Sequence, residues 1–109
     1  MKRGDVVIAA TGGGYGGKPR PYIVVQADTY PTHNVVLVGC TTTGERQVEI
    51  RPILTPSVAN GLTFLSEVMI DLPIAARRDK IAATIGALSV AEIDALNRAM
   101  VSFFGLDSV

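Results

Sequence analysis

The chain has no excess of charge of either sign, a single cysteine and no long apolar run, and each of these features excludes a class of protein. Ten Lys and Arg balance ten Asp and Glu, so net charge does not indicate a nucleic-acid partner. The sole cysteine, Cys40, excludes an internal disulfide and fits a reducing compartment, so we expect a cytoplasmic location. No apolar run approaches the roughly 20 residues of a membrane span, and no charged-then-apolar leader is visible. His33 stands alone and no His or Cys cluster has metal-ligand spacing, so we expect neither metal nor cofactor.

The most distinctive stretch is a glycine-dense loop, residues 12–17, followed by Lys18 and Pro19-Arg20-Pro21 and then a β-prone run. Its glycines spell GxGxxG and most of a P-loop, but both motifs require a helix next, and here a strand is expected. Pro19 also stands where a P-loop has its hydroxyl, so we exclude a nucleotide site. Two interpretations remain: a solvated surface hairpin, or a loop that delivers Arg20 to the mouth of a β-sheet.

Hydrophobic patterning predicts short strands and one terminal helix. Ser89 and Glu92 form a capping box, apolar residues then recur at helical spacing, and Gly105 follows, which predicts a helix near 90–104. The strand at 22–26 is apolar throughout and is expected to be buried on both faces. The strand at 47–50 alternates between polar and apolar residues, so one of its faces is expected to be exposed to solvent. The full set of expected strands is 5–10, 22–26, 35–38, 47–50, 67–72 and a short edge strand at 80–86. The length fits one domain, 1–109, and the pattern indicates a mainly β fold: a small, strongly bent sheet or half-open barrel partly covered by the helix.

These features resemble, in order and over nearly the whole chain, the MazF/PemK toxins of bacterial type II toxin–antitoxin pairs. The segments that carry the resemblance are Arg3-Gly4-Asp5-Val6, the glycine loop ending in Arg20-Pro21, Val38-Gly39-Cys40-Thr41-Thr42, Asn60-Gly61-Leu62, and Ile85-Gly86-Ala87-Leu88-Ser89. The resemblance implies a compact SH3-like β-barrel of about five to seven strands with a C-terminal helix, assembled as a homodimer. It also implies metal-independent, sequence-specific cleavage of single-stranded RNA to a 2′,3′-cyclic phosphate, restrained by a cognate antitoxin.

The resemblance also implies site residues, one at a time. Arg20 matches the arginine of the family's R-P motif, which contacts the scissile phosphate, and Thr41 matches its active-site threonine. Asp71 falls where some members carry a functional acid. The guanidinium of Arg20 suits phosphate charge, and the hydroxyl of Thr41 can donate a hydrogen bond to a phosphate oxygen. The expected RNA-binding residues are Tyr15, Lys18, Thr42, Arg77 and Arg78.

Several of these side chains have a second interpretation. Asp71 either accepts a proton, which requires a raised pKa, or is the structural partner of Arg77 or Arg78. The two arginines either follow the RNA backbone or belong to a solvated surface. Tyr22 either stacks on a base or packs in the core, and Cys40 is either a nucleophile or a buried thiol at a strand end.

Two other functions are compatible with the same fold. One is a CcdB-like toxin that binds a topoisomerase through its C-terminal helix. The other is a catalytically silent barrel that serves only as a protein-binding module. Arg20 and Thr41 favour the ribonuclease.

Overall fold

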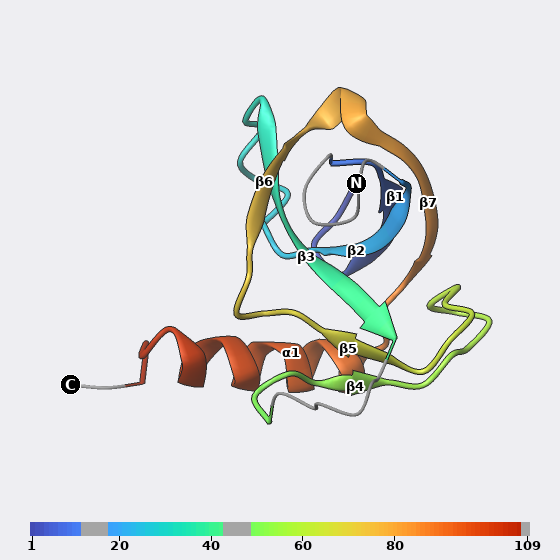
Figure 1. Ribbon diagram of the computed structural model, residues 1–109. Helices are drawn as coiled ribbons and strands as arrows, with labels where there is room; N and C mark the ends of the chain where they lie inside the picture. Colours follow the sequence, from blue (N-terminus) through green and yellow to red (C-terminus); the bar gives the residue numbers. More distant parts are fainter. Residues whose placement is uncertain (12–17, 43–48, 108–109) are drawn as a thin grey trace.

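The computed structural model describes residues 1–11, 18–42 and 49–107. Within these ranges, seven strands and one long helix form the fold (Figure 1). The strands are β1 (Asp5–Ala9), β2 (Arg20–Val24), β3 (Asn34–Thr42), β4 (Ile53–Leu54), β5 (Ser66–Val68), β6 (Ile74–Arg77) and β7 (Ile81–Ala87). A 3₁₀ turn, η1 (Arg78–Lys80), joins β6 to β7, and the helix α1 spans Val90–Phe103.

The sheet is organised around β3, its longest strand. The strand order is β4-β5-β3-β2-β1-β7, with β6 also paired to β3, and every pairing is antiparallel. The start of β3 pairs with β6, its middle with β2, and its end with β5. Figure 1 shows the sheet curling around a central axis, with β4, β5 and α1 to one side. The predicted mainly β, strongly bent sheet with a C-terminal helix is confirmed.

Two expected strands differ from the structure. The strand predicted at 67–72 ends at Val68, because the backbone N–H of Ile70 bonds back to Val68 and that of Leu72 to Met69, which turns the chain. Residues 47 and 48 of the strand predicted at 47–50 lie outside the described residues, and its remaining two lie in a turn, so that prediction is wrong for Glu49 and Ile50. The edge strand expected at 80–86 is present as β7.

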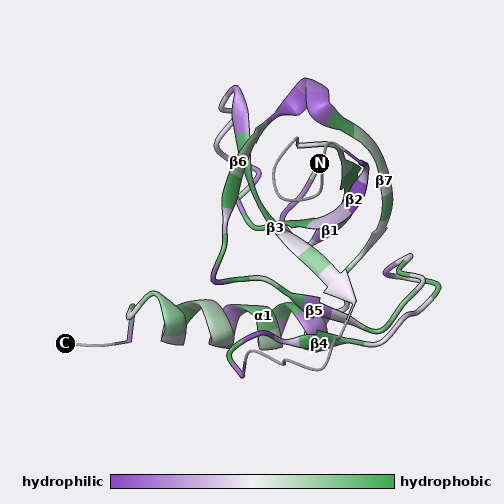
Figure 2. Ribbon diagram, in the orientation of Figure 1, coloured by the Kyte–Doolittle hydropathy of each residue, from purple (hydrophilic) through white to green (hydrophobic). Residues whose placement is uncertain are grey.

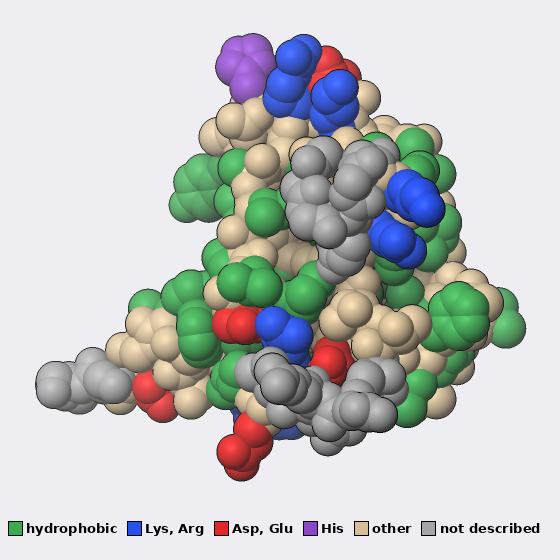
Figure 3. Space-filling model, in the orientation of Figure 1, with side chains coloured by type: hydrophobic (Ala, Val, Ile, Leu, Met, Phe, Trp, Pro, Cys, Tyr) green, Lys and Arg blue, Asp and Glu red, His purple; other side chains and the backbone are tan. Residues whose placement is uncertain are grey.

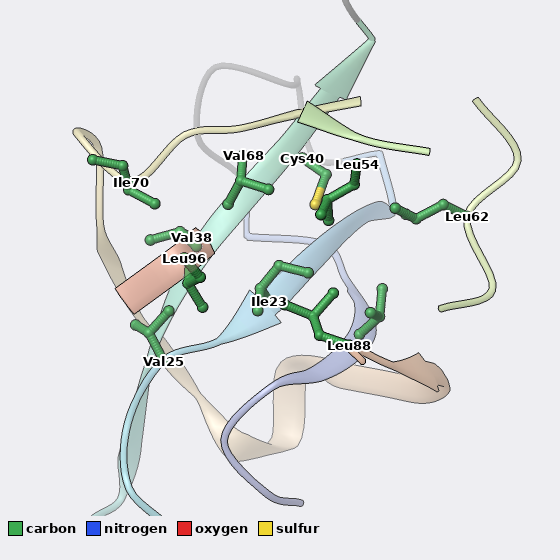
Figure 4. Close-up of a cluster of buried hydrophobic side chains, with 11 residues drawn as sticks. Ile23, Val25, Val38, Cys40, Leu54, Leu62, Val68, Ile70, Leu88 and Leu96 are labelled. Carbon is green, nitrogen blue, oxygen red and sulfur yellow. The ribbon is translucent and has the colours of Figure 1, made fainter. Parts of the chain in front are cut away.

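Two apolar clusters occupy opposite faces of the strands. Neighbouring residues of β2 divide between them: Ile23 packs toward α1 with Leu96 and Val68 (Figure 4), whereas Val24 packs inside the curl of the sheet. Both faces of β2 are therefore buried, as the unbroken apolar run predicts. In Figure 2 the hydrophilic η1 stands out between the hydrophobic strands β6 and β7, because all three of its residues are charged, and none of them is buried.

The N-terminus of α1 is tied to the barrel by its capping box. The Ser89 hydroxyl accepts a hydrogen bond from the Glu92 N–H, and the Glu92 carboxylate accepts one from the Ser89 N–H, as predicted. The second oxygen of Glu92 accepts a 3.1 Å hydrogen bond from the amide of Asn60, which belongs to the connection between β4 and β5. Gly105, with φ of +69°, follows the end of the helix as expected.

Candidate functional site

The candidate site lies where β2 and β3 separate. Tyr22 pairs with Gly39 in the β2–β3 ladder, so the same antiparallel register continued by two residues would set Arg20 opposite Thr41. The ladder stops at Tyr22, because the end of β3 turns away to pair with β5, Thr41 with Glu67 and Thr42 with Ser66. The divergence of the two strands opens the sheet between the two residues that the sequence singled out.

A cavity of about 380 Å³ occupies this opening. Its polar lining consists of one guanidinium and several hydroxyl groups, from Arg20, Thr41, Thr42, Thr63 and Ser66. Its apolar walls come mainly from Ile8, Leu62, Phe64 and Ile85, with Pro19 and Pro21 on either side of Arg20. A cation and hydroxyl donors over apolar walls suit a small anionic ligand such as a phosphate with its attached nucleoside.

The backbone of β2 sets the position of Arg20 in the sheet. It is the first residue of β2 and pairs with Ala9 of β1, and its side chain is exposed. The prolines at 19 and 21 fix φ near −65° on both sides, so the chain enters the strand in a restricted conformation. The structure thus places Arg20 among the residues that line the cavity, at the first position of β2 rather than in a loop before the strand predicted at 22–26.

Cys40 also lines the cavity, and its burial determines whether its thiol is protonated. Its side chain is buried in the cluster that packs toward α1, and burial raises the pKa of the Cys40 thiol to about 12. The thiol is therefore protonated at neutral pH and is not activated as a nucleophile. The second interpretation of Cys40, a buried thiol at a strand end, is the one that the structure supports.

The chain between β4 and β5 contributes another part of the cavity lining. Gly61 has φ of +71°, and a Cβ atom there would lie 2.2 Å from the carbonyl oxygen of Ile85. Only glycine lets the chain cross β7 this closely. The crossing brings Leu62, Thr63 and Phe64 onto the cavity, none of which the sequence indicated as functional residues.

Asp71 is not one of the residues that line this cavity. Its carboxylate forms a bidentate ion pair with Arg51, with N–O distances of 2.8 and 3.1 Å. The hydrogen bond from Arg51 lowers the pKa of Asp71, which is opposite to the raised pKa that proton abstraction would require. The structure favours the structural interpretation of Asp71, but its expected partner was wrong: it pairs with Arg51 rather than with Arg77 or Arg78.

The candidate RNA-binding residues fall into separate groups. Thr42 lines the cavity, and Lys18 is exposed two residues before Arg20, although it does not line the cavity. Tyr15 lies outside the described residues. Arg77 is opposite Asn34 at the start of β3, and Arg78 follows it in η1. At the ~3.3 Å rise of a strand residue, the start of β3 lies about 23 Å from Thr41.

Tyr22 is part of the core. Its side chain is only 3% exposed and packs inside the curl of the sheet, and its hydroxyl shares a 2.8 Å hydrogen bond with that of Thr11. It has no face open to a base, so the packing interpretation is the correct one. Among the residues that the structure describes, it is Phe64 that presents an exposed aromatic ring to this cavity.

The described ranges contain no group of three or more His, Cys, Asp or Glu side chains that could hold a metal ion. Among the helices of those same ranges, none is both long enough and apolar enough to cross a bilayer.

Comparison with known proteins shows the family to which this chain belongs. A family model described as PemK-like, MazF-like toxin of type II toxin–antitoxin systems matches residues 2–104. The chain is 34% identical over 107 residues to the probable endoribonuclease MazF of Mycolicibacterium smegmatis, covering 97% of this chain and 98% of that protein. A mycobacterial endoribonuclease solved in complex with its cognate antitoxin superposes with a TM-score of 0.80 at 25% identity, covering 97% of this chain and 96% of that one. The Mycobacterium tuberculosis toxin MazF-mt6 shares the fold, with a TM-score of 0.77 at 23% identity, covering 93% and 96% of the two chains. The chain therefore belongs to the family of PemK-like and MazF-like toxins of type II toxin–antitoxin systems.

Proposed function

We propose that the cavity between β2 and β3 is the site at which this toxin cleaves single-stranded RNA, as a sequence-specific endoribonuclease. The observation that carries the proposal is that Arg20 and Thr41, which a continued β2–β3 register would set opposite each other, line one cavity in a chain of this family. The topoisomerase-binding and silent-module alternatives have no comparable observation in their favour. Messenger RNA is the natural single-stranded substrate, so the toxin would act in the cytoplasm.

The reaction that fits these groups is attack of the RNA 2′-oxygen on the adjacent phosphorus. The P–O bond to the 5′-oxygen breaks, the 2′-OH loses its proton, and the 5′-oxygen gains one, which leaves a 2′,3′-cyclic phosphate. Arg20 would hold the phosphate and stabilise the negative charge that grows on its oxygens in the transition state. Thr41, and Thr42 beside it, would donate hydroxyl hydrogen bonds to the same oxygens.

Proton transfer in this scheme is not assigned to the acid that the sequence suggested. Asp71 is held by Arg51, has a lowered pKa and does not line the cavity, so it is a weak base. Cys40 is a neutral thiol. The described lining residues thus contribute charge, hydrogen bonds and positioning, which alone account for a large part of many enzymatic accelerations.

The direct test is to incubate the purified protein with defined single-stranded RNAs in EDTA. We expect cleavage at one short motif, with 2′,3′-cyclic phosphate ends mapped by sequencing of the product termini. An Arg20→Ala protein is the matched negative control for contaminating ribonucleases. A wild-type protein that cleaves no single-stranded RNA yet arrests growth would contradict the proposal and favour a topoisomerase-binding toxin.

We also propose that the toxin is a homodimer. Four large apolar side chains near the end of α1 remain exposed in the single chain: Val101, Phe103, Phe104 and Leu106. The rings of Phe103 and Phe104 pack edge to face, 5.2 Å apart, in a surface that a second copy would remove from water. Light scattering at micromolar concentration should give twice the chain mass, and a monomer mass would remove this proposal.

The proposed inhibitor is an antitoxin with an acidic, partly disordered segment that folds on binding. Such a segment would lie across the glycine loop and compete with RNA phosphate for Arg20. The loop itself, residues 12–17, is outside the described residues. Saturating antitoxin should abolish RNA cleavage, and undiminished cleavage by the complex would exclude occlusion of the site.

A further inference from the structure

Phe64 is an aromatic side chain that the fold leaves in water beside the cavity. Its side chain is 64% exposed, although Phe is among the residues most often buried in protein cores. It lines the same cavity as Arg20 and Thr41. Its ring belongs to neither of the two apolar clusters that stabilise the barrel.

The chain before Phe64 is anchored by one buried amide. The side chain of Asn60 is fully buried, and its oxygen accepts hydrogen bonds from the backbone N–H groups of Ser57 and Leu62, both 3.0 Å. Its nitrogen donates to the carbonyl of Thr55 and to the carboxylate of Glu92 in the capping box of α1. The segment that leads to Phe64 is therefore fixed to the helix.

The chain after Phe64 is anchored as well. Ser66 is buried, and its hydroxyl donates a 2.7 Å hydrogen bond to the carbonyl oxygen of Phe64. Ser66 also pairs with Thr42 of β3 on one side and with Leu54 of β4 on the other. The exposed ring is thus held at both ends of a short segment, so little backbone entropy would be lost on binding a ligand.

We propose that Phe64 is the stacking platform for a base next to the phosphate that Arg20 and Thr41 hold. The inference rests on the proposed ribonuclease function and names how the same site recognises its RNA. Recognition of single-stranded RNA relies on unstacked bases placed against aromatic side chains. A phenyl ring has no hydrogen-bonding group, so it would contribute affinity and orientation, with weak preference among bases.

The size of the cavity fits this arrangement. About 380 Å³ lies at the lower end of the 300–1,000 Å³ that is typical of small-ligand pockets. A phosphate and its sugar would occupy the opening between β2 and β3, and the attached base would lie outside it, against the ring. A base in a duplex has both faces stacked already, so a platform at this position also selects for single strands.

The test measures binding apart from cleavage. The probe is a single-stranded RNA that carries the mapped cleavage motif with 2′-deoxyribose at the cleaved position, which removes the attacking hydroxyl. Fluorescence anisotropy should show Phe64→Ala binding this RNA roughly 10-fold to 100-fold more weakly than wild type. Phe64→Tyr should restore most of the affinity, because its ring has the same face. Tyr30→Ala is the matched control, since Tyr30 is also 64% exposed but does not line the cavity.

Abasic RNA distinguishes stacking from a general effect on the loop. Two further probes lack the base on one side or the other of the cleaved bond. On one of them, wild type and Phe64→Ala should bind equally, because the stacked base is absent. Equal losses by Phe64→Ala on intact and both abasic RNAs would overturn the proposal, as would unchanged binding of intact RNA.

Other outcomes remain separable. A Phe64→Ala protein with a changed oligomeric mass would show that the ring serves a protein interface and would also overturn the proposal. Wild-type cleavage of RNA with no effect of Phe64→Ala would reject the platform but keep the ribonuclease. Wild-type protein that neither binds nor cleaves RNA would reject both.

Discussion

The two ends of β3 carry similar chemistry but are built differently. At the end of the strand, Thr41 and Arg20 line a cavity of about 380 Å³. At its start, Arg77 and Arg78 line a larger hollow of about 620 Å³ together with His33. Lys and Arg side chains also gather at the top of Figure 3, where Figure 1 draws η1. By charge and volume alone, the start of β3 would be the better candidate for a nucleic-acid site.

At the start of β3 the polar side chains hold a loop. Arg78 donates hydrogen bonds to the carbonyls of Thr32 and Tyr30, at 2.6 and 3.4 Å. Gln26 donates to the same carbonyl of Tyr30 and to the hydroxyl of Thr32. These contacts fix the connection between β2 and β3, so Arg78 has a structural task that the sequence did not reveal.

At the end of β3 the opening results from the path of the strands. β3 leaves β2 in order to pair with β5, so Arg20 and Thr41, which a continued ladder would have set opposite each other, line a cavity instead. The comparison teaches that a count of cations does not locate the site, whereas the point at which paired strands separate does. Substitutions at the two ends of the strand test this difference, and a further one tests a pair that lies at neither end.

The largest expected effect is that of Arg20→Ala. Losing a donor to a transition-state oxyanion typically costs about 3–4 kcal/mol, so cleavage should fall roughly 10²-fold to 10³-fold. The side chain is exposed, so thermal melting should be unchanged. Arg20→Lys should restore RNA binding better than the rate of cleavage, because an ammonium cannot reproduce the planar fork. Full cleavage by a correctly folded Arg20→Ala protein would show that the cavity is not the active site.

The next largest effect is a loss of stability, and it concerns the Asp71–Arg51 ion pair, which lies at neither end of β3. Asp71→Asn breaks the partly buried, bidentate pair with Arg51 and should lower the free energy of unfolding by about 1–3 kcal/mol at pH 7. Since the pair lies outside the cavity, the rate of RNA cleavage by the folded variant should match wild type. A large loss of cleavage without a loss of stability would restore Asp71 as a catalytic acid or base.

The pH dependence of this pair follows from the lowered pKa of Asp71. Its stabilisation is fully present above the unfolded value of 3.8 and is lost as the pH falls through the lower pKa of the folded state. Denaturant melts between about pH 6 and pH 2 should therefore show that wild type and Asp71→Asn converge in stability on acidification. A constant gap over that range would mean that the ion pair does not stabilise the fold.

Much of the fold could be read from local patterns. The capping box, the apolar period and the glycine after the helix placed α1 to within one residue of its observed end. The unbroken apolar run of β2 indicated burial on both faces because neighbouring side chains point to opposite sides of a strand. β4 and β6 were missed: the first has only two residues, and the second is Ile-Ala-Ala-Arg, in which alanine has little β-propensity.

The site was predictable only in part, since its two sides come from distant segments. The family motifs identified Arg20 and Thr41, but the register that sets them across from each other depends on strand pairing. The ion pair of Asp71 depends on Arg51, 20 residues away in the chain, so sequence proximity suggested the wrong arginines. Phe64 lies two residues beyond the segment Asn60-Gly61-Leu62 but is not part of it, so only its exposure on an anchored loop beside the cavity distinguishes it from a core phenylalanine.

A smaller effect is expected for Thr41→Val, which removes one neutral donor while keeping the shape of the side chain. Cleavage should fall about tenfold, less than for Arg20→Ala, because a neutral hydroxyl is a weaker donor than a guanidinium. Single-turnover kinetics at saturating RNA would locate the loss in the chemical step. Thr84→Val on β7 is the control, since Thr84 is also a strand threonine but does not line the cavity. Equal rates for both variants would remove Thr41 from the site.

The smallest effect should come from Arg77→Ala, at the other end of β3. Arg77 is 70% exposed and pairs with Asp79, which is 60% exposed, so its charge is already partly compensated and well hydrated. If it tracks RNA phosphate, its loss should reduce the slope of log affinity against log salt by about 0.7 and weaken binding about twofold to threefold. The rate at saturating RNA should be unchanged, since the side chain is about 23 Å along β3 from Thr41.

Lys18→Ala should change the salt slope equally but weaken binding more, because Lys18 precedes Arg20 by two residues. Salt titrations on RNAs shorter and longer than that span sharpen the comparison further, because only the longer ones can reach Arg77 from the cavity. A loss of rate by Arg77→Ala as large as that by Arg20→Ala would show that both ends of β3 act in cleavage.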